Sequence, residues 1–339
     1  MVFGCKNKAD TEVRFVKDLQ RGEVSMSRKN FLVAGLGLAA FISTGVAFAA
    51  EPDSCKAVHF ADVGWTDITS NTATASVILE ALGYTPDVQV LSVPVTYTSL
   101  KSKDIDVFLG NWMPTMEADI APYRDAGTVE TVRVNLTGAK YTLATNEAGK
   151  ALGIDDFSKI APNKDALEGK IYGIEPGNDG NRLILDMIAN NTFDLSGFEL
   201  VESSEQGMLA EVAKHDGEGK PIVFLGWEPH PMNANFKMTY LTGGDEIFGP
   251  NFGGAEVATN VRKGYVAECP NTGKLLQNLE FTLPMENEIM GAILDDGTDP
   301  MEAAKTWLAA HQDVLGPWLD GVTTKDGGDA MAAVTAALQ

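Results

Sequence analysis

The sequence is poor in the residues that carry most enzyme chemistry. It has 3 cysteines and 4 histidines among 339 residues, and the histidines lie far apart along the chain. After residue 50 it contains no G-x-S-x-G, H-E-x-x-H or Walker-type motif. The acidic stretch 294–300 lacks the full pattern of a calcium-binding loop. We therefore expect neither catalysis nor a cofactor or metal, and we interpret His230 as a packing or solvent-facing residue.

Basic residues are also scarce. The chain has 26 lysines and arginines against 47 aspartates and glutamates, which gives a formal net charge of −21. This balance argues against nucleic-acid binding and against docking on anionic lipid through a basic patch. The hydrophobic content of 44% is typical of a globular protein. The length exceeds what one hydrophobic core needs, so we expect two domains or lobes.

Long apolar runs are absent except near the N-terminus. The run 31–50 follows two basic residues and ends in a small-residue A-F-A pattern. This predicts a signal peptide at about 26–49 within a leader, 1–50, that is removed, and hence a periplasmic protein. A membrane anchor is the alternative, since the run could just cross a bilayer, but glycine, serine and threonine dilute it. The first residues lack such a pattern, so translation starts at either Met1 or Met26.

Two cysteines, Cys55 and Cys269, lie beyond this leader. In an exported chain such a pair predicts one disulfide, with two buried free thiols as the alternative. A disulfide would place both cysteines in the same lobe, so the chain would leave that lobe and return. We predict lobe one at 51–137 plus 247–339 and lobe two at 138–246. Two crossings between lobes would form a hinge with a cleft beside it.

Short apolar runs alternate with helical patterns along the rest of the chain, which predicts an α/β fold with largely parallel strands. The helices expected from apolar spacing include one at 70–84, with Val77, Ile78 and Leu82 on one face. The expected strands lie at 56–65, 88–93, 105–112, 128–136, 140–146, 170–177, 221–227 and 255–264.

Three of the five tryptophans end strand-like runs in the same way. The stretches VHFADVGW, IDVFLGNW and PIVFLGW place Trp65, Trp112 and Trp227 just past the carboxyl end of a strand. In open α/β sheets, ligands bind at that edge. The first two belong to lobe one and the third to lobe two, so all three are predicted to meet in the cleft. Packing is the alternative for any one of them, and it is our interpretation of Trp307 and Trp318, which lack the pattern.

Several tryptophans in one cavity favour a ligand that binds π faces. A quaternary ammonium ion fits this chemistry, because each desolvated ring contributes roughly 0.5–2 kcal/mol through cation–π contact. A sugar also stacks on tryptophan, but it needs many hydrogen-bonding side chains, and the strand ends offer few.

The stretches GWTDIT, GNWMPT, GAKYTLAT, EPGNDGN and FLGWEPHPMN resemble the choline and betaine substrate-binding proteins of ATP-binding cassette importers. The resemblance covers about 55–335. It implies a two-lobe, type II periplasmic binding protein with an interlobe cleft that closes on its ligand. The partners it implies are an inner-membrane permease and its ATPase.

The resemblance also implies roles for particular residues. Asp67 and Asn178 would supply polar contacts to the ligand, and the cysteine pair matches the choline branch of the family. The trimethylammonium group would lie in an aromatic cage of Trp65, Trp112, Tyr141 and Trp227.

The residues near the predicted cage favour choline over glycine betaine. Asp67 is expected to be ionised, so it would attract a cation, accept the choline hydroxyl and repel a betaine carboxylate. No lysine or arginine accompanies the tryptophan motifs. Asn178 begins a predicted helix, whose positive end favours anions, and capping that helix is its alternative role. Acetylcholine, glycine betaine and a choline-sensing receptor remain alternatives, and we expect a monomer.

Overall fold

The computed structural model describes residues 51–339. The predicted signal peptide lies outside them. Among the helices of this part of the chain, none combines the length and the apolar character needed to cross a bilayer.

The strands form one sheet in the order β2-β1-β3-β9-β4-β7-β5-β6, and β8 also pairs with β4. The strands are β1 (Ala57–Asp62), β2 (Thr85–Val90), β3 (Val107–Met113), β4 (Val129–Asn146), β5 (Lys170–Tyr172), β6 (Glu199–Val201), β7 (Val223–Glu228), β8 (Met238–Tyr240) and β9 (Gly254–Arg262).

The prediction of largely parallel strands holds only at the two ends of the sheet. There β1 is parallel to β2 and β3, and β5 is parallel to β6 and β7. In the centre β9 is antiparallel to both β3 and β4, and β4 is antiparallel to β7. The sequence pattern missed this centre because local periodicity does not reveal which strand is a neighbour.

Strand β4 joins the two parallel ends. The sequence predicted two strands, 128–136 and 140–146, but the chain continues through Gly138 in one strand with shifts of register. The first part of β4 pairs with β9, and the part from Lys140 to Thr145 pairs with β7. Gly138 has a φ of +77°, which glycine adopts without strain. The residue limits that we predict for the lobes remain a prediction.

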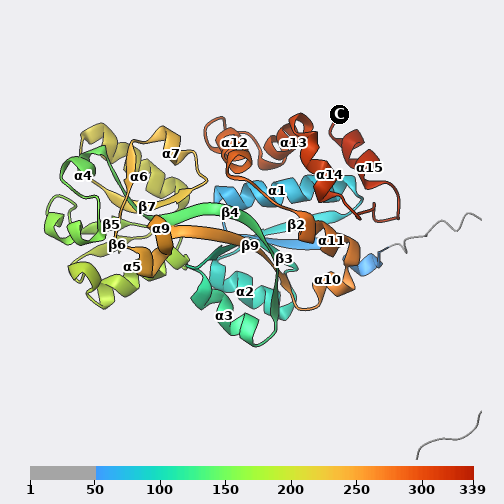
Figure 1. Cartoon of the computed structure of the whole chain (residues 1–339), viewed down its shortest axis with the longest axis horizontal. Coiled ribbons are helices and arrows are strands. Elements are labelled where there is room, and N and C mark those ends of the chain that lie inside the picture. The colour runs from blue at the N-terminus through green and yellow to red at the C-terminus, as the bar shows by residue number, and fades with distance from the viewer. Residues whose placement is uncertain (1–50) are drawn as a thin grey trace, which may run out of the picture. The chain divides into compact units, whose positions relative to one another are not determined.

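Helices cover both faces of the sheet. Figure 1 shows α1 with α12–α15 on one side of β1–β3, and α2 and α3 on the other. The helices are α1 (Thr66–Ala81), α2 (Val93–Ser102), α3 (Glu117–Asp125), α4 (Glu147–Ala151), α5 (Asp179–Ala189), α6 (Glu205–Glu218), α7 (Met232–Asn235), α8 (Asp245–Phe248), α9 (Pro250–Gly253), α10 (Tyr265–Glu268), α11 (Pro270–Asn278), α12 (Leu283–Leu294), α13 (Pro300–Ala310), α14 (Leu315–Trp318) and α15 (Ala330–Ala337).

Helix α1 begins four residues earlier than the apolar spacing predicted, at Thr66 rather than residue 70. A tight connection after β1 causes this, because the two carboxylate oxygens of Asp62 accept hydrogen bonds from the Gly64 amide and the Thr69 hydroxyl. Almost all of α1 is buried, which explains its many small residues. The early start places Asp67 in the first turn of the helix.

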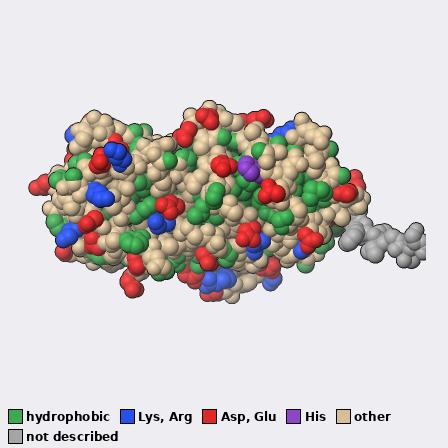
Figure 2. Space-filling view, turned by 45° about the horizontal axis from the view of Figure 1, so that its top comes forward, with side chains coloured by type: hydrophobic (Ala, Val, Ile, Leu, Met, Phe, Trp, Pro, Cys, Tyr) green, Lys and Arg blue, Asp and Glu red, His purple; other side chains and the backbone are tan. Residues whose placement is uncertain are grey.

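Acidic and basic side chains are intermixed on the face of the molecule that Figure 2 shows. On the face in Figure 2 the acidic side chains are scattered, and no basic patch gathers there.

The predicted disulfide between Cys55 and Cys269 is confirmed. It links the start of β1 to the segment between α10 and α11, across 214 positions of the sequence. Glu51 strengthens the same junction by accepting hydrogen bonds from the Thr272 amide and hydroxyl. The N-terminal end of the described chain is therefore fixed to its C-terminal helices.

We predict that the double variant Cys55→Ser/Cys269→Ser has a free energy of unfolding lower by about 2–5 kcal/mol, because the open chain gains conformational entropy when unfolded. Urea unfolding followed by circular dichroism would measure it. Reducing agent should lower the stability of the wild-type protein and leave that of the variant unchanged. Equal unfolding midpoints for the two oxidised proteins would contradict the prediction.

Candidate ligand-binding site

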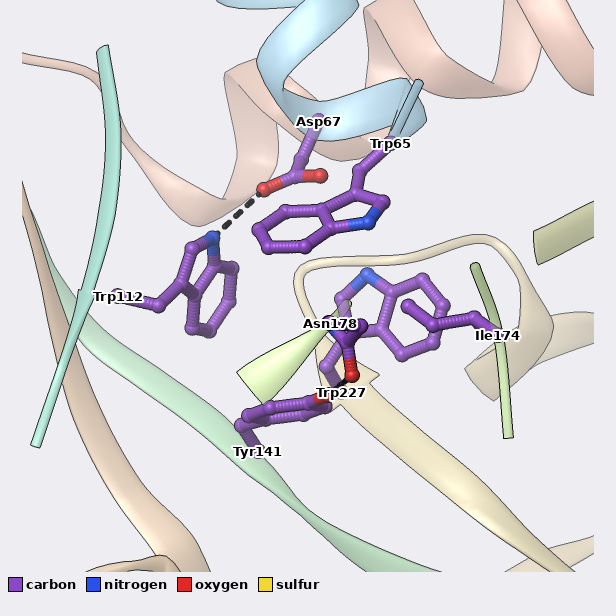
Figure 3. A pocket seen from close by; sticks show the side chains of 7 residues that line it. All are labelled: Trp65, Asp67, Trp112, Tyr141, Ile174, Asn178 and Trp227. Carbon is purple, nitrogen blue, oxygen red and sulfur yellow. Dashed lines mark hydrogen bonds between the residues drawn. The ribbon is translucent and has the colours of Figure 1, made fainter. Parts of the chain in front are cut away.

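One cavity lies where α1, α5, β3, β4 and β7 come together (Figure 3). All its lining side chains are buried. They are Trp65, Asp67, Trp112, Tyr141, Ile174, Asn178 and Trp227.

The structure brings all six residues predicted from the sequence to this cavity. Ile174 is the one lining residue that the sequence did not single out. It follows β5 in the stretch KIYGIEPG and carries no chemical group that distinguishes it from a core residue. The role of each residue toward a ligand remains a prediction.

Four aromatic rings surround the cavity. Figure 3 shows the three indoles and the phenol of Tyr141 arranged around one space. The ring centroids of Trp112 and Tyr141 are 5.9 Å apart, and those of Tyr141 and Trp227 are 6.3 Å apart at an interplanar angle of 83°. The register of β4 with β7 pairs Tyr141 with Trp227, so the sheet itself sets this last distance.

Asp67 places a carboxyl group beside the aromatic rings. Its Oδ2 accepts a hydrogen bond of 3.0 Å from the indole Nε1 of Trp112, which fixes the plane of that ring. Its Oδ1 is buried without a hydrogen-bond partner among residues 51–339, and so is the Nε1 of Trp65. The site thus holds one acceptor that no side chain of the described chain satisfies.

The protonation of Asp67 differs from the sequence-based prediction of an ionised group. Burial raises the pKa of its carboxyl to about 8, and the negative charge of Glu205 adds to the increase. The carboxyl on its own therefore favours the protonated form at pH 7.

Asn178 performs the capping role that was its alternative interpretation. Its Oδ1 accepts a hydrogen bond from the Asn181 amide, which caps α5, and another of 2.9 Å from the Tyr141 hydroxyl. Burial raises the pKa of Tyr141 well above its usual value, so the phenol keeps the proton that it donates. Asn178 therefore orients a ring of the cage as well as lining the cavity.

His230 is buried rather than facing solvent. Its ring packs edge-on against Trp227, with 4.8 Å between centroids. Trp318 packs against Phe281, and Trp307 stacks on His311, both away from the cavity, as the sequence predicted. Within residues 51–339 no group of three or more histidine, cysteine, aspartate or glutamate side chains is placed to hold a metal ion.

Comparison with known proteins agrees with this geometry. Residues 56–310 match the family model OpuAC, the substrate binding domain of the ABC-type glycine betaine transport system. A solved "ABC-transporter choline binding protein in complex with choline" is 72% identical, with a TM-score of 0.85, over 85% of this chain and 100% of that one. The same description "in unliganded semi-closed conformation" gives 72% identity and a TM-score of 0.78, over 84% and 99% of the two chains.

A more distant relative also matches part of this chain. The glycine betaine/carnitine transport binding protein GbuC of Listeria monocytogenes is 30% identical over 186 residues, which are 55% of this chain and 57% of that protein. The family resemblance inferred from the sequence is thus confirmed, and with it the type II fold and a binding role without catalysis. This chain belongs to the family of substrate binding domains of ABC-type glycine betaine transport systems.

Proposed function

We propose that this chain captures choline for an ABC importer by enclosing the trimethylammonium group in the aromatic cage. The observation that carries the proposal is the composition of the cavity wall. It combines four aromatic rings and one carboxyl group with no lysine or arginine.

The four rings match the chemistry of a methylated ammonium ion. Such an ion has no strong hydrogen-bond donor, so the attractions open to it are contact with π faces, dispersion and the charge of a nearby carboxylate. Each desolvated ring contributes roughly 0.5–2 kcal/mol. A small ligand has a ceiling of about 1.5 kcal/mol per non-hydrogen atom, which puts micromolar affinity within reach of choline.

The carboxyl group of Asp67 suits both ends of choline. In its ionised form, which a bound cation favours, it attracts the ammonium group, and its unpartnered Oδ1 is available to accept a hydrogen bond from the choline hydroxyl. A betaine carboxylate in the same place would be repelled by the ionised form of Asp67, and no basic side chain lines the cavity to offset that repulsion. Glycine betaine is the second candidate, because the Asn178 amide and the N-terminus of α5 favour an anion.

The similarity of this chain to the two solved choline binding proteins supports a closed conformation of the kind that encloses a ligand. At the same 72% identity, its TM-score is higher against the choline complex, 0.85, than against the unliganded semi-closed form, 0.78. We infer that closure around choline is the signal that a permease and its ATPase recognise. We also propose a periplasmic monomer, and a choline-sensing receptor would use the same closure.

We predict that Trp112→Ala and Trp227→Ala each weaken choline binding at least tenfold, because each removes a ring and admits water to the cage. Isothermal titration calorimetry would measure the affinity, and circular dichroism would confirm folding. Trp307→Ala, outside the cavity, is the matched control and should bind like the wild type. Full affinity in both folded cage variants would contradict the assignment.

We predict that the wild type binds choline more tightly than glycine betaine and that Asp67→Asn narrows the difference. The substitution removes a charge that attracts the choline cation and repels the betaine carboxylate. Competition calorimetry with both ligands, acetylcholine and dimethylethanolamine would rank them. If the wild type bound glycine betaine more tightly than choline, glycine betaine would replace choline as the proposed ligand.

We predict that choline affinity rises with pH between 6 and 8 and levels off above about 8. The pKa of Asp67 is about 8 without a cation, and choline favours the ionised form, so below pH 8 binding must release a proton. The change approaches about tenfold per pH unit. Calorimetry in two buffers with different ionisation heats would count the released protons. Asp67→Asn should show a flat profile, and a flat wild-type profile would refute the coupling.

A further inference from the structure

A buried carboxyl group outside the cage connects two of the three segments that carry the tryptophans of the cage. Glu205 is the first residue of α6 and is fully buried. Its Oε2 accepts a hydrogen bond of 2.9 Å from the Thr66 amide, and its Oε1 accepts one of 2.5 Å from the Thr66 hydroxyl. Thr66 lies between Trp65 and Asp67 in the sequence, so this contact reaches the backbone that positions both residues.

His230 holds the same carboxyl from the other side. The Met232 amide donates a hydrogen bond of 2.9 Å to the His230 Nδ1, so the ring proton is on Nε2. That Nε2 lies 3.2 Å from the Glu205 Oε1 and donates to it. Since the His230 ring also packs on Trp227, Glu205 is connected to the segment that supplies the third tryptophan.

The contact with Thr66 spans the predicted lobes. Thr66 lies in the predicted lobe one, whereas Glu205 and His230 lie in the predicted lobe two. Thr66 and Glu205 are 139 positions apart in the sequence. The free amides at the start of α1 and the positive end of the helix favour a carboxylate there. Both hydrogen bonds to Thr66 therefore cross between the predicted lobes, whereas the contact of Glu205 with His230 lies within lobe two.

Glu205 does not line the ligand cavity. Glu205 can therefore affect affinity only without contact with the ligand, either through the arrangement of the protein or through its charge, which raises the pKa of Asp67.

We propose that Glu205 is a latch for the closed state, a positioning residue that binds the start of α1 only when the lobes close and so sets Trp65 and Asp67 in place. The proposal deepens the function proposed above and rests on it. On this proposal, the closed state is stabilised partly by contacts within the protein and partly by contacts with the ligand.

The test is the affinity of Glu205→Gln for two cations, choline and tetramethylammonium, measured at pH 9, where Asp67 is mostly ionised in both proteins and its titration contributes little to the comparison. The glutamine amide nitrogen cannot accept the Thr66 amide proton, so one hydrogen bond becomes a clash of donors. We expect affinity to fall about tenfold or more, mainly through faster dissociation, and by the same factor for both cations. Asp67→Asn, in contrast, should lose more for choline, because tetramethylammonium has no hydroxyl.

Two further variants separate a latch from a general structural role. Thr66→Val keeps the backbone amide and removes the hydroxyl, so it should lower cation affinity less than Glu205→Gln does. The double variant Thr66→Val/Glu205→Gln should bind only slightly more weakly than Glu205→Gln alone. Glu211→Gln, on the exposed side of the same helix, is the matched control and should bind like the wild type. The melting temperature of ligand-free Glu205→Gln should stay near that of the wild type, because the open state lacks the contact.

Equal affinity of wild type and Glu205→Gln would overturn the latch and leave choline binding in place. A large loss of ligand-free stability in Glu205→Gln would also overturn it, because the residue would then support the fold in both states. If the wild type bound glycine betaine instead of choline, the proposed ligand would fail. The same variants titrated with glycine betaine would still test the latch, because the expected fold-loss of affinity does not depend on the ligand.

Discussion

A methylated ammonium ion can be held firmly only if π faces approach it from several directions at once. One helix or one strand presents its side chains to one or two sides, so the rings have to come from distant parts of the chain. Here Trp65 precedes α1, Trp112 is in β3, Tyr141 is in β4 and Trp227 is in β7. Four strands that lie far apart in the sequence, β1, β3, β4 and β7, bring them together, so the cavity is a product of the fold and not of a local motif.

Polar groups in so dry a cage have to be satisfied or left for the ligand. The Tyr141 hydroxyl and the Trp112 indole are satisfied by Asn178 and Asp67, which keeps both rings fixed. One Asp67 oxygen is left over, and the pKa of its carboxyl is raised because burial removes it from water and Glu205 adds a nearby negative charge. The same burial that makes cation–π attraction strong therefore makes this carboxyl responsive to a cation.

Much of this site could be predicted from the sequence, for a physical reason. The sequence placed three tryptophans, each one or two positions after a glycine, just past the end of an apolar strand, and the repeated pattern predicted that they share a site. In the structure Trp65 follows β1, whereas Trp112 and Trp227 are the last residues but one of β3 and β7, and all three line the cavity. The antiparallel centre of the sheet was not visible, because strand neighbours depend on contacts between distant residues. Glu205 was missed as well, since a glutamate in the first turn of a helix is ordinary, and only the approach of Thr66 gives it significance. The protonation of Asp67 depends on burial, which a sequence does not state.

The position of β9 has a consequence for the order in which the protein assembles. This strand lies between β3 and β4, yet it is made more than a hundred residues after β4 begins. Until residues 254–262 emerge, β3 and β4 each have an open edge that no earlier strand covers. Such edges recruit strands from other chains, so a nascent molecule is exposed to aggregation until this late segment inserts and completes the sheet.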